Sequence, residues 1–251
     1  MRAARYHGNS DVRVEEVSRR SIAPTEVRID VEACGICGSD LKEYVDGPKA
    51  APTNPHPLTG ETLPVTLGHE IGGTVVDVGR EVDGLAPETN VAVSPVMWCG
   101  ECRLCESGNY HLCEQKGWVG FSGDGGGFAD EVIVSQEKAI PLPEGVPAEM
   151  GALVEPFTVG LHALHRSAFE AGDVAAVFGC GPIGLTIVQN LRAAGAQRIY
   201  ASEPQEMRRE VADECGADVV VDPFGEDPVD RIVDETDGVD VAFEVAGTEP
   251  T

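Results

Sequence analysis

One segment near the middle of the chain restricts the fold more than any other. Residues 174–178 form a short apolar run typical of a buried strand, residues 179–184 read Gly-Cys-Gly-Pro-Ile-Gly, and residues 185–194 have the pattern of a helix. A Gly-x-Gly-x-x-Gly turn between a strand and a helix lets the backbone approach a pyrophosphate at the helix N-terminus. We therefore predict a Rossmann-type domain with a parallel, doubly wound sheet. The residues predicted to face a dinucleotide are Gly179, Gly181, Pro182, Ile183 and Gly184.

A carboxylate follows the next predicted strand. Residues 198–202 form a second apolar run that ends at Glu203, about 20 residues beyond the glycine turn. A carboxylate at this point can accept hydrogen bonds from a ribose diol, and it repels a 2′-phosphate. The sequence therefore predicts NAD in preference to NADP. Strand-like and helical runs continue to alternate, so we assign residues 151–251, including a linking helix over 148–166 with a kink or restart at Pro156, to the N-terminal part of this domain.

The first part of the chain has a different pattern. Residues 12–17, 26–33 and 128–134 alternate apolar and polar side chains, which is typical of strands with one solvated face. We predict an antiparallel, β-rich domain over residues 1–150. A proline-rich segment at 46–64 has no such period and is predicted to be a long loop.

Four cysteines lie within a short lobe, about residues 95–116, as Cys99-x2-Cys102-x2-Cys105-x7-Cys113. Four thiolates at this spacing can hold one zinc ion tetrahedrally, and such a shell leaves no position for a substrate. Two disulfides fit less well, because the short spacing is difficult to bridge and the chain shows no secretion signal. The lobe is therefore predicted to hold a structural zinc.

A further cysteine precedes a predicted short helix. Ser39 and Asp40 are expected to cap this helix, and a thiol near a helix N-terminus ionises more readily. Because metal ligation requires the thiolate, Cys37 is the better candidate ligand. Cys34 is interpreted as a small buried hydrophobic residue.

An imidazole and a carboxylate stand side by side at His69 and Glu70, directly after Gly68, and Glu155 lies in the predicted linking helix. A thiolate, an imidazole and carboxylates can together hold zinc with one coordination position open, as a catalytic site requires. Cys37, His69, Glu70 and Glu155 are thus candidate ligands of a second, catalytic zinc.

Charge limits the classes of partner. The 251 residues include 43 acidic and 18 basic side chains, giving a net charge of −25. Such a protein repels phosphate backbones, so nucleic acids and anionic membranes are not expected as partners. No apolar run reaches the length of a membrane span. Only four of the bases are lysines, and together with the scattered acids this favours a halophilic protein in a salt-rich cytoplasm over an ordinary acidic one.

Taken in order, these segments resemble the zinc-containing medium-chain alcohol dehydrogenase family over the whole chain. Within this family, the loop His56-Pro57-Leu58-Thr59-Gly60 is similar to that of 2,3-butanediol (acetoin) dehydrogenases, and sorbitol and threonine dehydrogenases are close relatives. The segments that carry the resemblance are residues 35–40, 68–70, 99–113, 155–156, 179–184 and 202–204.

The resemblance implies a GroES-like catalytic domain followed by a Rossmann domain. It implies that Cys37 and His69 ligate the catalytic zinc. Two alternatives remain for a further ligand. Polyol-type members use the residue after the histidine, here Glu70, which we favour, and other alcohol dehydrogenases place a ligand where Glu155 stands.

The resemblance also implies roles for two polar residues. Ser39 would begin a proton relay from the substrate hydroxyl, and Arg208 would reach the adenosine ribose, although a plain surface arginine is an equal alternative. Many members carry a histidine three positions after the relay residue, whereas this chain has Lys42. The far end of the relay is therefore left open between Lys42 and solvent.

The implied reaction is hydride transfer from a secondary alcohol or vicinal diol to NAD, with one catalytic and one structural zinc. A polyol, threonine or sugar dehydrogenase is the alternative within the family, and a non-catalytic, zinc-stabilised binding fragment is the alternative outside it. Family members continue beyond four Rossmann strands and return to the catalytic domain, so the chain is expected to be C-terminally truncated, with weak or no turnover by itself. The full-length protein is expected to be a homodimer or homotetramer.

Overall fold

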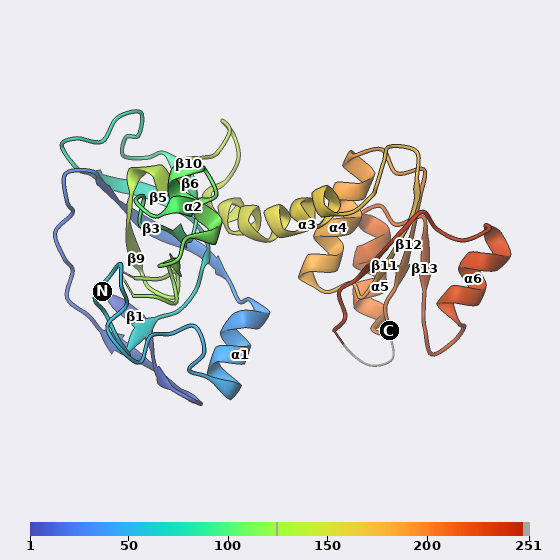
Figure 1. Ribbon diagram of the computed structural model, residues 1–251, viewed down its shortest axis with the longest axis horizontal. Helices are drawn as coiled ribbons and strands as arrows, with labels where there is room; N and C mark the ends of the chain where they lie inside the picture. The colour runs from blue at the N-terminus through green and yellow to red at the C-terminus, as the bar shows by residue number, and fades with distance from the viewer. Residues whose placement is uncertain (124, 248–251) are drawn as a thin grey trace. The chain divides into compact units, whose positions relative to one another are not determined.

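The computed structural model describes residues 1–123 and 125–247 of the chain. The chain divides into two units, Met1–Glu155 and Pro156–Thr251, and each has its own hydrophobic core (Figure 1). None of the helices in the described ranges combines the length and the apolar character that crossing a membrane would need.

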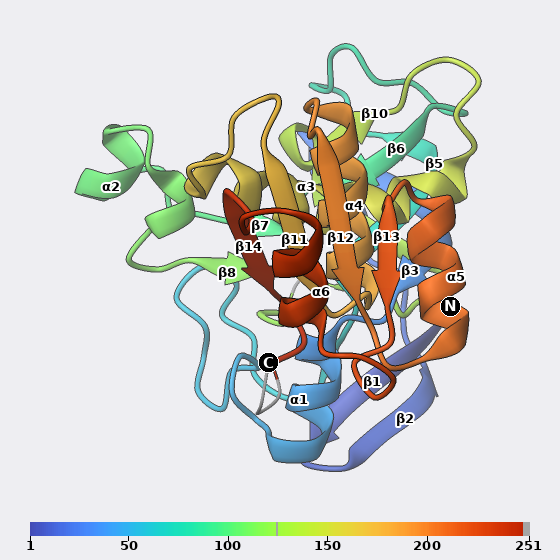
Figure 2. The same cartoon turned by 90° about the vertical axis from the view of Figure 1, so that its right-hand side faces the viewer.

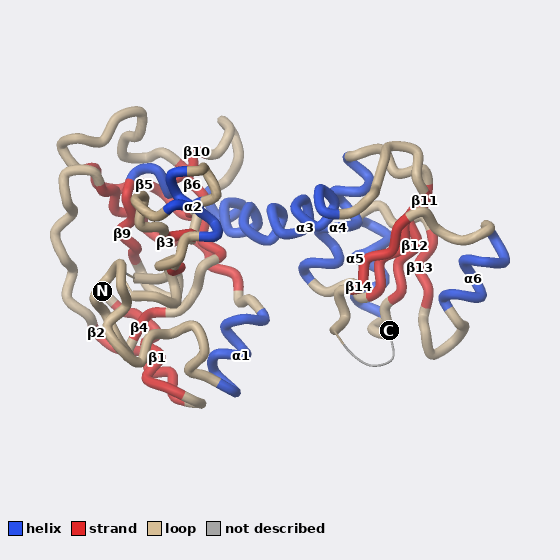
Figure 3. The backbone as a smooth tube through the Cα atoms, in the orientation of Figure 1, coloured by secondary structure: helices blue, strands red, loops and turns tan. Residues whose placement is uncertain are grey.

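Antiparallel strands dominate the first unit (Figure 3). One sheet has the order β10-β6-β5-β3-β9, a second has the order β2-β1-β4, and β7 pairs with β8. The strands are β1 (Arg2–Gly8), β2 (Asp11–Glu16), β3 (Glu26–Gly35), β4 (Val65–Thr66), β5 (Glu70–Val78), β6 (Asn90–Val93), β7 (Val96–Met97), β8 (Gly117–Trp118), β9 (Glu131–Ser135) and β10 (Ala139–Pro141). The helical segments are α1 (Gly38–Asp46), α2 (Arg103–Glu106) and the 3-10 turns η1 (Tyr110–Leu112), η2 (Gln136–Lys138) and η3 (Ala148–Leu153).

The alternating pattern of β3 explains how this sheet is buried. Val27 and Ile29 are fully buried, and they pack with Val75 of β5 and Val132 of β9 in one apolar cluster. Successive side chains of a strand point to opposite faces, so this period places every second residue in the core. The predicted antiparallel, β-rich fold is confirmed.

The helix after the first cysteine pair begins earlier than predicted. Ser39 and Asp40 were expected to cap it, but the N-cap is Cys37 and the helix is α1. The reason is that one carboxylate oxygen of Asp40 accepts a hydrogen bond from the backbone N–H of Cys37 at 2.9 Å. The turn is thus closed two residues before Ser39. Residues 47–64 form no helix or strand, in agreement with the predicted loop.

The predicted linking helix over 148–166 is two elements. The 3-10 turn η3 precedes α3 (Val154–Arg166), so Pro156 lies in the first turn of α3. Backbone N–H groups of a first helical turn have no partner within the helix, so proline is tolerated there. Of the two predicted alternatives, the interior kink is therefore wrong, and the helix restarts just before the proline.

The second unit is a parallel sheet with the order β13-β12-β11-β14 (Figure 2). Ile187 of α4 and Ala212 of α5 pack in one apolar cluster with the strands, whereas Ile232 of α6 packs in another with Ala176 and Tyr200. Helices on both faces confirm the doubly wound fold. The elements are β11 (Val174–Phe178), α4 (Pro182–Ala193), β12 (Arg198–Ser202), α5 (Glu206–Glu214), β13 (Val219–Val221), α6 (Pro228–Glu235) and β14 (Val241–Glu244).

The strand order reverses beside β11. This strand pairs with β12 on one side and with β14 on the other. In open parallel sheets, ligands bind outside the carboxyl ends of the strands at such a reversal. The glycine turn of residues 179–184 lies at this point.

Candidate functional site

Three of the candidate ligands of a catalytic metal lie together in the first unit. The Sγ atom of Cys37, a ring nitrogen of His69 and a carboxylate oxygen of Glu70 all lie within 4.8 Å of one another. Cys37 precedes α1, His69 precedes β5 and Glu70 is the first residue of β5. Sulfur, imidazole nitrogen and carboxylate oxygen are the ligand types that zinc prefers.

The pairing of β3 with β5 brings these segments together. Gly35 at the end of β3 is the partner of Glu70 in the antiparallel register. A Cβ atom at residue 35 would overlap the carboxylate of Glu70. Glycine at this position therefore leaves room for Glu70 to turn toward Cys37.

The environment of His69 fits a metal ion. Its side chain is buried, its Nε2 lies 3.3 Å from the Oγ of Ser39, and its Nδ1 lies 3.6 Å from Oδ1 of Asp40. Both Nδ1 of His69 and Oδ1 of Asp40 are buried without a hydrogen-bond partner in the described part of the chain. Burial lowers the pKa of His69, yet its interactions with Asp40 and Cys37 raise that pKa to about 10. The site thus favours a positive charge, which a divalent metal would supply.

Replacing Asp40 with asparagine is expected to weaken zinc binding at this site by about 10- to 100-fold, the usual effect of losing a carboxylate behind a histidine ligand. Asparagine would present an amide N–H₂ either to the backbone N–H of Cys37 or to the ring of His69. The measurement is competition for zinc with a graded chelator. The control is Asp46→Asn on the same helix, whose exposed carboxylate contacts Lys49 at 3.5 Å. Equal zinc affinity in the two variants would refute a supporting role for Asp40.

Two other candidates stand outside the cluster. Among the described residues, Glu155 does not join the group formed by Cys37, His69 and Glu70. Burial raises the pKa of Glu155, the charge of His69 lowers it, and the charges of Glu70 and Asp40 raise it, so the charge of Glu155 interacts with those of the site. Burial and then the charge of Asp40 raise the pKa of Cys34 to about 12, so Cys34 stays a thiol at neutral pH.

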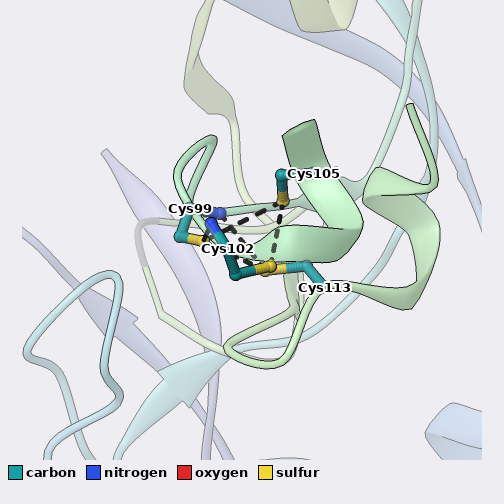
Figure 4. A group of neighbouring side chains, drawn as sticks. All are labelled: Cys99, Cys102, Cys105 and Cys113. Carbon is teal, nitrogen blue, oxygen red and sulfur yellow. Dashed lines mark hydrogen bonds between the residues drawn. The ribbon is translucent and has the colours of Figure 1, made fainter. Parts of the chain in front are cut away.

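The four cysteines of the lobe converge as predicted for a metal site (Figure 4). Their neighbouring sulfurs are 3.5 to 4.0 Å apart, and all four cysteines are free. A tetrahedron with zinc–sulfur bonds of about 2.3 Å has edges of about 3.8 Å, whereas a disulfide would need about 2.05 Å. The sulfur geometry therefore fits a zinc ion.

Backbone N–H groups prepare these sulfurs for ligation. Hydrogen bonds from the backbone of Glu114 and then of Cys105 lower the pKa of Cys102 to about 6. Cys113 accepts hydrogen bonds from the N–H groups of Cys99 and Gln115, both at 3.3 Å. Since the thiolate is the ligand form, these bonds favour metal binding.

The glycine turn of the second unit has the form that a pyrophosphate needs. A Cβ atom on Gly184 would overlap the carbonyl of Gly179, and one on Gly179 would lie 2.9 Å from the nitrogen of Ala246. A Cβ atom on Gly181 would meet open space. Pro182 begins α4 and Ile183 follows it, so Gly181 is where a ligand can approach the helix N-terminus.

Glu203 is bonded to this turn. The side chain is 3% exposed, and Oε2 accepts a hydrogen bond from the N–H of Cys180 at 2.8 Å. Arg208 lies 3.9 Å from Oε2 and is partly exposed. The structure thus brings Glu203 to the turn and Arg208 to Glu203.

Three residues near the first site were not identified from the sequence. Asp40 faces His69, and the ring of Phe121 lies 4.9 Å from the ring of His69 between centroids. Glu43 is a buried carboxylate on α1. The only signal for Asp40 was its place beside Ser39. Phe121 gave none, because its partner His69 is distant in sequence, and no local pattern distinguishes Glu43 from the other acids of the chain.

Comparisons with known proteins agree with this architecture. Residues 23–144 match the family described as "Alcohol dehydrogenase GroES-like domain", and residues 182–251 match "Zinc-binding dehydrogenase". The (R,R)-butanediol dehydrogenase of Bacillus subtilis (strain 168) is 48% identical over 98% of this chain and 71% of its own length. The crystal structure of 2R,3R-butanediol dehydrogenase from Bacillus subtilis superimposes with a TM-score of 0.90 at 47% identity, covering 98% of this chain and 71% of that one.

A more distant relative is the sorbitol dehydrogenase of Bacillus subtilis (strain 168), which is 34% identical over 98% of this chain and 69% of its own length. The family matches, the two units and the two ligand clusters agree with one another. The chain therefore belongs to the zinc-binding, medium-chain alcohol dehydrogenases, a family of oxidoreductases with a GroES-like domain.

Proposed function

We propose that the intact protein oxidises a vicinal diol of the 2,3-butanediol class, or reduces the matching hydroxyketone, with NAD as the cofactor. The observation that carries this proposal is the cluster of Cys37, His69 and Glu70 in a chain that is 48% identical to a butanediol dehydrogenase. We propose that Met1–Glu155 is the catalytic domain and Pro156–Thr251 belongs to the cofactor domain. The intact protein is proposed to be a homodimer or homotetramer.

In the catalytic domain, Cys37 and His69 would hold the catalytic zinc, with Glu70 as the further ligand. Glu70 is preferred to Glu155 because its oxygen lies within 4.8 Å of both other donors. A bound zinc ion supplies Lewis-acid chemistry that lowers the pKa of an alcohol. Glu155, whose charge interacts with those of His69 and Glu70, is proposed to lie against the substrate side of the site. The lobe of Cys99, Cys102, Cys105 and Cys113 would hold the structural zinc.

Ser39 is placed to take up the proton of the substrate hydroxyl. Its Oγ is 3.3 Å from Nε2 of His69, so it lies at the edge of the ligand cluster. As Ser39 accepts the proton of the substrate, it passes its own proton outward. Lys42, three residues further along α1, is exposed, and the proton would pass from Ser39 either to Lys42 or directly to solvent.

The cofactor domain selects and orients the nucleotide. A bound NAD would supply the acceptor for the hydride of the carbinol carbon, while Ser39 takes up the proton of the hydroxyl. Gly181, Pro182 and Ile183 would bind the pyrophosphate, with open space at Gly181, and Arg208 would contact the ribose. The buried carboxylate of Glu203 would repel a 2′-phosphate, which favours NAD over NADP.

The test is to supply the zinc-loaded intact protein with NAD or NADP and (2R,3R)-butanediol, and to follow formation of the reduced nicotinamide. We expect turnover with NAD and far less with NADP. The meso diol and simple secondary alcohols serve as comparison substrates. Absence of turnover with every diol and secondary alcohol would contradict the proposal.

The second candidate is a polyol dehydrogenase, which the 34% identity to a sorbitol dehydrogenase supports. Polyols and diols share the secondary hydroxyl, so the same ligands would serve both. A higher kcat/KM for sorbitol than for butanediol would favour this candidate.

We also propose that the protein works in a salt-rich cytoplasm. Only Asp40, Glu43, Glu131 and Glu203 are buried among the acids in the described ranges, so the remaining described acids lie at or near the surface. Screening of their repulsion is expected to raise the melting temperature by several degrees between low and molar KCl. Differential scanning fluorimetry over a KCl series checks this. A melting temperature that stays flat or falls would count against adaptation to salt.

A further inference from the structure

Glu43 is a buried carboxylate without a cation. It is 2% exposed on α1, and no ion pair reaches it from the described residues. Its two oxygens instead accept three backbone N–H groups, from Lys49 at 2.8 Å and from Ala50 and Ala51 at 3.0 Å. Hydrogen bonds to an ionised acceptor are shorter and stronger than neutral ones. The carboxylate therefore fixes the beginning of the long loop that follows α1.

The backbone of Glu43 is anchored as well. Its carbonyl oxygen accepts a hydrogen bond from the hydroxyl of Tyr6 at 2.8 Å and from the N–H of Gly47 at 2.9 Å. Tyr6 belongs to β1 and is fully buried. A Cβ atom on Gly47 would overlap this carbonyl. The C-terminal end of α1 is thus held tightly against β1.

Each anchored segment leads to the metal cluster. Along α1, Ser39 stands one turn before Glu43, and the helix begins directly after Cys37. A rotation of α1 would therefore move both Ser39 and Cys37 relative to His69.

The loop leads to the same place by a second route. Ala51, held by Glu43, is buried in a cluster with Tyr6 and Phe121. The ring of Phe121 lies 4.9 Å from that of His69. Further along the loop, the hydroxyl of Thr59 donates a hydrogen bond to the carbonyl of Ser122 at 2.7 Å. The loop thus shares an apolar cluster with Phe121 and is hydrogen-bonded to the residue that follows it.

We infer that Glu43 is a positioning residue of the active site: its carboxylate fixes Ser39 on α1 and, through Ala51, Phe121 against His69. The inference rests on the proposed function, since it names the alcohol as the reactant that Ser39 and Phe121 orient. On this inference the loop of residues 47–64 affects the position of the alcohol and has no effect on the binding of the cofactor. A carboxylate is required because three N–H groups need two acceptor oxygens.

The test is Glu43→Gln in the zinc-loaded intact protein, because glutamine keeps the shape but replaces one acceptor oxygen with a donor. At least one of the three loop bonds is then lost. We expect faster hydrogen exchange at the amides of Lys49–Ala51. We also expect kcat/KM for the diol to fall about 100-fold, the effect of a misplacement of about 1 Å, while KM for NAD is unchanged. The control is Asp46→Asn, an exposed carboxylate on the same helix, which should match wild type in both measurements.

A purely structural role gives a different result. In that case Glu43→Gln lowers the melting temperature and speeds amide exchange, but kcat/KM for the diol at low temperature stays at the wild-type value, and the inference is wrong. Tyr6→Phe provides a second variant if Glu43→Gln does not fold, because it removes the bond to the Glu43 carbonyl and leaves the carboxylate intact. It should lower kcat/KM for the diol in the same direction, and an unchanged value would also refute the inference.

The wild-type protein separates this inference from the proposed function. If wild type does not oxidise the diol, the proposed substrate is wrong. The comparison of Glu43→Gln with Asp46→Asn then uses whichever alcohol the wild type oxidises. If Glu43→Gln then leaves kcat/KM for that alcohol unchanged, or changes KM for NAD as strongly, this inference is wrong and the proposed function is unaffected.

Discussion

Replacing Cys37 with serine is expected to lower kcat for the diol by about 1000-fold or more, because several kcal/mol of Lewis-acid stabilisation are lost with the catalytic zinc. Serine is close to cysteine in size, so the fold of α1 and β3 should persist. The hydroxyl is a poor replacement for a thiolate ligand at neutral pH. Zinc content measured by elemental analysis should fall by one ion per chain, and the melting temperature should change little.

The matched control is Cys34→Ser, three residues earlier. Cys34 lies outside the ligand cluster, and burial keeps it protonated, with a pKa of about 12. The control should retain both zinc ions and most of the activity. Full activity in Cys37→Ser would show that Cys37 is not a zinc ligand. Loss of zinc in Cys34→Ser alone would show that Cys34 is the ligand instead.

Replacing Cys102 with serine is expected to remove the other zinc ion and to unfold the lobe that contains it. Structural zinc sites bind with an apparent free energy of about 10 kcal/mol or more, which becomes folding free energy for the segment that carries the ligands. Cys105 and Cys113 also lose the sulfur of Cys102, which lies 3.6 and 4.0 Å from theirs. We expect one zinc ion fewer per chain, a fall in the melting temperature of many degrees, and faster proteolysis within residues 99–113.

Cys215→Ser is the control for this experiment. Cys215 is a free, partly buried cysteine in the other unit and takes no part in either ligand cluster found among the described residues. It should retain both zinc ions and the proteolysis rate of wild type. A Cys102→Ser protein that keeps two zinc ions and an intact lobe would show that four sulfurs are not the shell.

The sequence allowed much of the fold to be predicted where local signals are strong. The strand, glycine turn and helix of residues 174–193 follow from one motif, because each glycine meets a local steric need within the turn. The lobe of four cysteines follows from spacing alone, since all its ligands lie within one short segment. Glu203 also follows from its place at the end of β12.

The rest of the site depends on contacts between distant segments. Register of β3 against β5 brings Gly35 beside Glu70, and no local pattern specifies that register. The N-cap was predicted at Ser39 and Asp40 but lies at Cys37, because the carboxylate of Asp40 accepts a hydrogen bond from the backbone N–H of Cys37. Glu43 resembles many other acids of this chain, and only its three loop partners distinguish it.

The choice between Glu70 and Glu155 as the further ligand also depends on contacts between distant segments. Both are single glutamates in sequence, and the family resemblance allowed either. The distances among donor atoms favour Glu70, while the pKa of Glu155 responds to the charges of His69, Glu70 and Asp40. The sequence alone did not decide between the two glutamates, and the distances in the folded chain supply a basis for the choice.

Zinc content of the purified wild-type chain, together with its Cys37→Ser and Cys102→Ser variants, tests the central claim most directly. The account predicts about two zinc ions per chain in wild type and about one in each variant, with different ions lost in the two cases. One zinc ion in wild type that persists in Cys37→Ser would contradict it, because Cys37, His69 and Glu70 would then not form a metal centre.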